Sequence, residues 1–187
     1  MARPRRCYLL DASALVAFLL NNPSGDLAGA KRRLLKLFAS RRSNTDADYF
    51  VPNFCMAECS KAFAKIFLRD DPTETQIMAY RQHVETLLDW VSSKKKYVIK
   101  TYKLKREHLV DIESVFIADS QLSSRDGGAL SGLDGIIISM GRTLAKKRGR
   151  ENVFILTTDT RIARLCRANG DPFPAAVDLK NQEIPGT

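Results

Sequence analysis

The length, composition and charge of the chain exclude several classes of protein before any motif is considered. Its 187 residues, of which 44% are hydrophobic and 27% charged, exclude a disordered chain and are typical of one globular domain, which we place over residues 1–187. The net charge of +9 favours a polyanionic partner such as RNA, DNA or an anionic membrane.

The N-terminus combines basic residues with an apolar stretch, as a secretory signal does. Arg3, Arg5 and Arg6 precede the stretch, but Asp11 divides it into two short runs. No later segment has the ~18 consecutive apolar residues that a membrane-spanning helix needs. We therefore expect a cytoplasmic protein that is not associated with a membrane.

Residues 7–91 predict two strands and four helices. The apolar run from Cys7 to Leu10 has the length and composition of a buried parallel strand. Pro52 closes a second short strand, and Asn53 is placed to cap the helix that follows it. The expected elements are strands over 7–10 and 49–51, and helices over 12–21, 26–42, 53–69 and 73–91.

Residues 97–179 continue the alternation of strands and helices. We expect strands over 97–102, 153–156 and 175–179, helices over 106–122, 133–147 and 160–168, and a loop over 123–131. This order predicts an α/β fold with a mostly parallel central sheet flanked by helices on both faces. Ligands of such sheets bind beyond the carboxyl ends of the strands.

Four acidic residues stand where predicted elements begin or end. Asp11 and Asp159 follow the apolar runs 7–10 and 153–156. Asp134 directly precedes the apolar face of a helix, and Glu58 lies at the edge of an apolar helix stripe. Because the carboxyl ends of parallel strands meet at one edge of a sheet, we expect the two strand-end acids to face the same crevice.

Each acid also has a structural explanation. Asp11 and Asp159 could cap the helices that follow them. Residues 131–134 fit a capping box, and Glu58 could pair with a lysine one or two turns further along its helix. Four converging carboxylates, however, repel one another unless a cation lies between them. Oxygen-only ligation suits Mg²⁺ or Mn²⁺, whereas Zn²⁺ prefers His or Cys.

Four short segments contain these acids in a fixed order. They are Leu-Leu-Asp-Ala-Ser-Ala-Leu at 9–15, Val-Pro at 51–52 followed by Glu58, Leu-Ser-Gly-Leu-Asp-Gly-Ile-Ile at 130–137, and Ile-Leu-Thr-Thr-Asp at 155–159. In order and spacing they resemble the motifs of the PIN-domain family, over about residues 6–180. Gly135 stands where the family usually has Ala, which we expect to matter little. The stretch 70–128 is longer than in the compact bacterial toxins of the family.

The resemblance implies a PIN-like fold and a metal-dependent endoribonuclease that hydrolyses RNA phosphodiester bonds. All four acids would be catalytic and would form the site for Mg²⁺ or Mn²⁺. Asp11 and Asp134 would be the main ligands. Glu58 and Asp159 would ligate directly, hold metal-bound water or bind a second ion.

Neighbouring polar residues would assist the acids. The hydroxyl groups of Ser13 and of Thr157 or Thr158 would orient the ligands, although helix capping and strand packing explain them equally well. Arg161 and Arg164 follow the last acid along the predicted helix 160–168 and would hold the RNA backbone. A solvated helix face explains this basic series equally well.

The resemblance also implies partners. Many members of the family are toxins of bacterial or archaeal toxin–antitoxin pairs of the VapC type, and others process ribosomal RNA. The expected partners are therefore RNA, a cognate antitoxin protein and, as a homodimer, a second copy of the chain. Two alternatives stay open: an inactive PIN-like module that binds RNA or acts as a scaffold, and a structure-specific DNA nuclease.

Other catalytic classes lack the residues that they need. The two histidines lie on predicted helices away from the acids, which argues against a two-histidine ribonuclease and a Ser-His-Asp hydrolase. The cysteines form no C-x-x-C pair, and we interpret them as small buried residues in a reducing cytosol. The histidines are His83 and His108, and the cysteines are Cys7, Cys55, Cys59 and Cys166.

Overall fold

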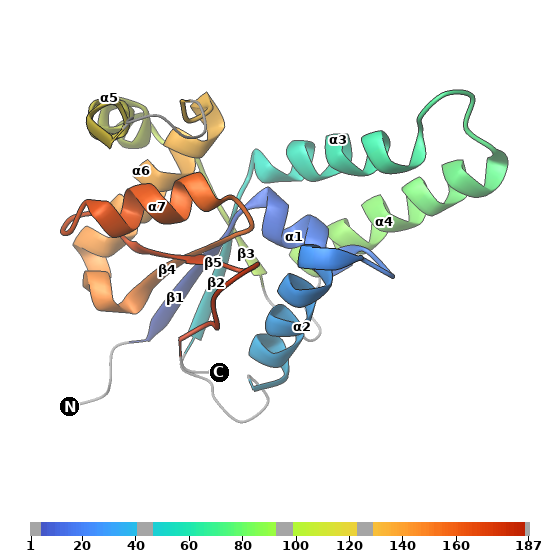
Figure 1. Cartoon of the computed structure of the whole chain (residues 1–187), viewed down its shortest axis with the longest axis horizontal. Helices are drawn as coiled ribbons and strands as arrows, with labels where there is room; N and C mark the ends of the chain where they lie inside the picture. Colours follow the sequence, from blue (N-terminus) through green and yellow to red (C-terminus); the bar gives the residue numbers. More distant parts are fainter. Residues whose placement is uncertain (1–4, 41–46, 93–98, 123–128, 186–187) are drawn as a thin grey trace.

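A five-stranded, all-parallel sheet forms the centre of the molecule (Figure 1). The structure is a computed structural model and describes residues 5–40, 47–92, 99–122 and 129–185. The strand order is β3-β2-β1-β4-β5. The strands are β1 (Arg6–Leu10), β2 (Ala47–Pro52), β3 (Ile99–Tyr102), β4 (Val153–Thr157) and β5 (Ala175–Asp178).

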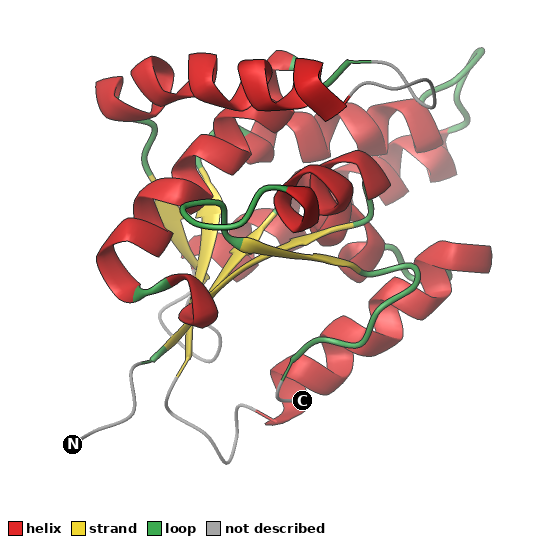
Figure 2. Ribbon diagram, turned by 60° about the vertical axis from the view of Figure 1, so that its left-hand side comes forward, coloured by secondary structure: helices red, strands yellow, loops and turns green. Residues whose placement is uncertain are grey.

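Helices cover both faces of this sheet. In Figures 1 and 2, α5, α6 and α7 pack on one face, and α1 to α4 form a second group on the other. No helix of the described ranges is both long and apolar enough to cross a membrane. The helices are α1 (Ala12–Leu19), α2 (Gly25–Ser40), α3 (Cys55–Phe67), α4 (Glu74–Ser92), α5 (Arg106–Leu122), α6 (Gly132–Arg148) and α7 (Thr160–Ala168), with a 3₁₀ turn at Arg150–Asn152.

The expected α/β architecture is confirmed. The predicted strands and helices are all present, with ends that differ by a few residues at most from those expected. Parts of three expected segments lie outside the described residues: 41–42 of the second helix, 97–98 of the third strand and 123–128 of the loop.

The register of the central strands positions the site. The residues Cys7 to Leu10 and all of β4 are buried, as two-sided packing of a parallel sheet requires. Leu10 pairs with Leu156, and the N–H of Asp11 donates to the carbonyl of Leu156 at 3.0 Å. The first residues after β1 and β4 are therefore held side by side at the carboxyl edge of the sheet.

The prediction that Asn53 caps the third helix is wrong. α3 begins at Cys55, and the residue at its N-cap position, Phe54, makes no side-chain capping bond. The Oδ1 of Asn53 instead accepts from the N–H of Leu104 at 3.2 Å, and its own N–H donates to the carbonyl of Tyr102. Asn53 thus ties the start of α3 to the end of β3.

Gly135 matters more for packing than expected. A Cβ at this position would lie 3.0 Å from Cζ of Phe116 and 3.1 Å from Cγ1 of Ile112, both on α5. The glycine therefore permits a close approach of α5 to the first turn of α6, which is the turn that contains Asp134.

Candidate functional site

Asp11 is the most buried of the four predicted acids, with 5% of its surface exposed. It caps α1, with Oδ1 accepting from the N–H of Ala12 at 2.7 Å. Its Oδ2 accepts from two hydroxyl groups, Ser13 Oγ at 2.5 Å and Thr157 Oγ1 at 2.9 Å. Burial raises the pKa of Asp11 above its usual value, and the negative charge of Asp134 adds to the increase, although these hydrogen bonds oppose it.

The two hydroxyl groups are themselves oriented by the backbone. Ser13 Oγ accepts from the N–H of Thr158, and Thr157 Oγ1 accepts from the N–H of Asp159, both at 2.9 Å. Each hydroxyl proton is therefore directed at Asp11. The structure thus places Ser13 and Thr157 where the sequence suggested, while Thr158 contributes through its backbone N–H.

Glu58 approaches Asp11 from the first turn of α3. One oxygen of each carboxylate and the Sγ of Cys55 lie within 4.8 Å of one another. Burial raises the pKa of Glu58, and the charges of Asp11 and then Asp134 raise it further. The alternative explanation, an ion pair between Glu58 and a lysine of its own helix, has little support. The charge of Lys61 lowers the pKa of Glu58, but only as a minor contribution.

Cys55 belongs to this cluster, which the sequence interpretation missed. The sequence alone suggests only a small buried residue at this position. In the structure, Cys55 lies one turn before Glu58 on the same helix face. Burial, followed by the charges of Asp11 and Glu58, raises the pKa of its thiol far above the ordinary range. A protonated thiol is a weak hydrogen-bond donor, and Cys55 donates to the Glu58 carboxylate.

Asp134 caps a helix and also lies near the other acids. It forms the predicted capping box, with the N–H of Ser131 donating to its Oδ2 at 3.1 Å and its own N–H donating to Ser131 Oγ at 3.2 Å. Its carboxylate is also close enough to Asp11 and Glu58 for its charge to raise the pKa of both. The structural role therefore does not exclude a role in a charged site.

Asp159 lies at the same edge of the sheet but in a different electrostatic environment. It caps α7, and its carboxylate receives the guanidinium of Arg161, with Nη2 2.6 Å from Oδ2 and Nε 3.2 Å from both oxygens. Although burial opposes the change, these hydrogen bonds hold the pKa of Asp159 below its usual value. The Nη2 of Arg161 also lies 3.7 Å from Oδ2 of Asp134, so this side chain connects two of the acids.

The donor set fits a hard divalent cation. The carboxylates of Asp11 and Glu58 lie together, the charge of Asp134 acts on both, and the hydrogen-bond donors to Asp11 in the described chain are all neutral. Carboxylate oxygens are the ligands that Mg²⁺ and Mn²⁺ prefer, and they make up two of the three ligand atoms in the group formed with Cys55. The fourth acid already has an internal cation in Arg161.

The histidines are remote from the acids, as expected. His83 packs beside Phe63 and Phe67, and its Nδ1 contacts the carbonyl of Ala79. His108 is fully buried, and its Nδ1 accepts from the N–H of Lys105.

Comparison with known proteins supports the fold. No family model matches the sequence, and no curated protein matches it. Among solved structures, the chain is similar to one in the crystal structure of VapBC2 from Rickettsia felis bound to a DNA fragment from their promoter. The TM-score is 0.54, with 10% identity over 91% of this chain and 97% of that chain. Likeness at this identity establishes the fold alone, and it confirms the PIN-like architecture expected from the motifs.

Proposed function

We propose that residues 1–187 form a single PIN-like nuclease domain that depends on Mg²⁺ or Mn²⁺ and hydrolyses RNA phosphodiester bonds. The observation that supports this most strongly is the proximity of the Asp11 and Glu58 carboxylates at the carboxyl edge of the sheet, with Asp134 near enough for its charge to act on both. Like charges in a buried cluster disfavour their own ionised forms. A fold that keeps such a cluster gains stability from a cation that binds between the acids.

Each acid has a distinct part in this proposal. Asp11 and Asp134 are the main cation ligands, and the Asp11 carboxylate is held in place by the Ser13 and Thr157 hydroxyls. Glu58, which is less buried than Asp11, completes the site from α3. The PIN-like fold agrees with these roles, since the acids occupy the positions of the family motifs.

Arg161 acts as an internal counter-ion. Its guanidinium lies between Asp134 and Asp159 and reduces the repulsion between their carboxylates. Without this arginine, a second divalent ion would be needed to do so. We therefore assign one divalent cation to the acids around Asp11, with Asp159 ion-paired to the arginine.

The reaction follows from these groups. A bound divalent cation would let a water molecule lose a proton near neutral pH and would neutralise charge on the phosphate. In the hydrolysis, the oxygen of a water molecule would form a bond to phosphorus as the ester P–O bond breaks, and the departing sugar oxygen would take up one proton for the one that the water loses.

A cleavage assay tests the proposal. Labelled RNA and DNA of the same sequence are incubated with the purified chain in Mn²⁺ or in chelator, with Asp134→Asn as the inactive control. We expect the wild type to cut RNA only with the cation. Binding of RNA without cleavage would identify an inactive binding module, and preferential cutting of DNA would identify a DNA nuclease.

The finer biological role is also a proposal. We propose that the chain is the toxin of a toxin–antitoxin pair and assembles with a protein antitoxin and with a second copy of itself. The similarity to a VapBC2 structure supports this only through the fold. Growth arrest on expression in a host cell, absent for Asp134→Asn, tests toxicity, and light scattering of the purified chain tests the dimer.

A further inference from the structure

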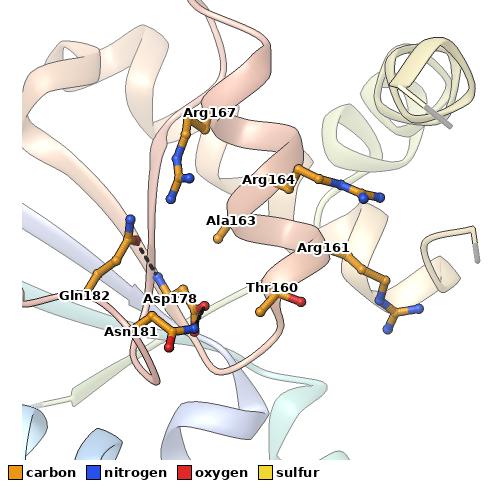
Figure 3. Close-up of a pocket in the computed structure, with 8 residues that line it drawn as sticks. All are labelled: Thr160, Arg161, Ala163, Arg164, Arg167, Asp178, Asn181 and Gln182. Atoms are coloured by element: carbon orange, nitrogen blue, oxygen red, sulfur yellow. Dashed lines mark hydrogen bonds between the residues drawn. The ribbon is translucent and has the colours of Figure 1, made fainter. Parts of the chain in front are cut away.

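A groove lies between α7 and the turn that follows β5. It has a volume of about 700 Å³. Figure 3 shows α7 on one side of it and the turn with Asp178, Asn181 and Gln182 on the other. Ala163 lines it from α7, together with Arg164 and Arg167, and Thr160 and Arg161 lie at its end nearest to the acids.

The lining of this groove favours an anion. Three arginines of α7 line it, although the side chains of Arg161 and Arg164 extend from the other side of the helix in Figure 3. The one carboxylate in the lining is that of Asp178. That carboxylate is 5% exposed and is bonded within the turn, accepting from the N–H of Lys180 at 3.0 Å and from Nδ2 of Asn181 at 2.7 Å. Arg167, in contrast, is exposed and extends from α7 toward the turn (Figure 3). The groove therefore presents the cation of Arg167 opposite a turn whose one carboxylate is already hydrogen-bonded.

The turn is fixed to the rest of the fold, so the groove exists before any ligand binds. The N–H of Leu179 donates to the carbonyl of Thr157, the last residue of β4, at 2.8 Å. Arg33 of α2 donates from Nη1 to the carbonyl of Leu179 at 2.9 Å. The Oε1 of Gln182 accepts from the N–H of Asp178, which leaves the NH₂ group of this amide as a donor for a ligand. A preformed site loses less entropy on binding.

The near end of the groove, at Thr160 and Arg161, adjoins Asp159. Arg161 is bonded to Asp159, and the positive charge of Lys180 in the turn also acts on Asp159. From Thr160 to Arg167, α7 rises about 10 Å at ~1.5 Å per residue. That length matches about three stacked nucleotides at ~3.4 Å each.

We propose that this groove binds the phosphodiester backbone of the RNA strand to one side of the scissile phosphate, with Arg167 as the principal phosphate-binding residue. The inference rests on the proposed nuclease function. In this proposal, the main contact to the RNA backbone is made by Arg167 and not by Arg161. The guanidinium of Arg161 extends from the other side of α7 and is bonded to Asp159 (Figure 3). The Gln182 amide, on the opposite side of the groove, completes the subsite.

Binding of labelled single-stranded RNA in chelator tests the groove without catalysis. The full chain is compared with Arg167→Ala, Arg167→Lys and the control Arg81→Ala, which removes an exposed charge from α4. We expect Arg167→Ala to weaken binding of a ten-nucleotide RNA on the order of tenfold. The slope of the logarithm of the binding constant against the logarithm of the salt concentration should become smaller by about one. Arg167→Lys should restore the salt dependence, and a dinucleotide should not distinguish the variants.

The outcomes separate this inference from the proposed function. Equal losses of RNA affinity in Arg167→Ala and Arg81→Ala would overturn the proposal that the groove binds RNA, even if the wild type cuts RNA in Mn²⁺. A specific loss in Arg167→Ala would support the groove, even if no cleavage is found. Tighter Arg167-dependent binding of DNA than of RNA with the same sequence would overturn the assignment to RNA. Thermal melts check that each variant is folded.

Discussion

Asp134→Asn separates the structural role of this residue from its proposed role as a cation ligand. In the structure, the side chain accepts from the N–H of Ser131 and its charge acts on Asp11 and Glu58. Asparagine keeps an oxygen for the capping box but removes the charge. The two roles therefore predict different responses to a cation.

The size of each effect can be worked from these contacts. In chelator, the mutation removes a favourable charge at the start of α6, worth roughly 0.3–1 kcal/mol. It also removes repulsion from Asp11 and Glu58, which acts in the opposite direction. The melting temperature of the metal-free variant should therefore stay within about 2–4 °C of the wild type, since roughly 1 kcal/mol corresponds to that shift for a chain of this size.

The response to Mn²⁺ should differ much more. At a hundred times the dissociation constant, a cation that binds only the folded form adds roughly 2.7 kcal/mol, or about 5–11 °C, to the wild type. If loss of this ligand weakens binding about a hundredfold, the same concentration adds only about 0.4 kcal/mol to Asp134→Asn. The exposed residue Asp89 supplies the control, since Asp89→Asn should keep the full shift.

Thermal melts of the three proteins, in chelator and in millimolar-range Mn²⁺, make this comparison. A variant that melts well below the wild type in chelator and keeps an undiminished Mn²⁺ shift would refute the reasoning. Asp134 would then be a helix cap and not a cation ligand.

Three further predictions follow from the site. Burial and mutual repulsion raise the pKa of Asp11 and Glu58, so the folded chain binds protons more tightly than the unfolded one. In chelator, the free energy of unfolding should therefore fall as the pH rises from about 4 through the raised pKa values. Denaturant titrations in saturating Mn²⁺ should not show this decline. Thr157→Val removes a buried donor to Asp11 and an acceptor for the N–H of Asp159, so urea unfolding should show a loss of about 1–3 kcal/mol. Arg161→Ala should cost about 1 kcal/mol of stability and strengthen Mn²⁺ binding or increase its stoichiometry in calorimetry, because Asp159 loses its internal cation; weaker Mn²⁺ binding would contradict the counter-ion role.

The order of elements could be predicted because local signals agree with the fold. The apolar runs that became β1 and β4 are long enough for a buried strand and too short for a helix. Ser131 and Asp134 specify the start of α6 through a purely local motif. The start of α3 could not be predicted in the same way, because Asn53 bonds to Leu104, which is 51 residues away in the sequence.

The site could be predicted in part for a similar reason. Asp11 and Asp159 follow strands, and the ends of parallel strands meet at one edge, so their proximity follows from the fold class. The pairing of Arg161 with Asp159 could not be read from spacing, because residues two apart do not face each other within a helix. It forms because Asp159 is the capping residue outside α7. Cys55 was overlooked because its apolar character suggested only core packing.

The most direct test of the acid cluster is single-turnover cleavage of a labelled RNA in Mn²⁺ by the wild type, Asp11→Asn and Asp89→Asn. Asparagine at position 11 can still accept the capping bond from Ala12, so the fold should persist. We predict that Asp89→Asn cleaves at the wild-type rate and that Asp11→Asn is slower by more than about a hundredfold. A folded Asp11→Asn variant with the wild-type rate would contradict the proposal that this cluster is the catalytic site.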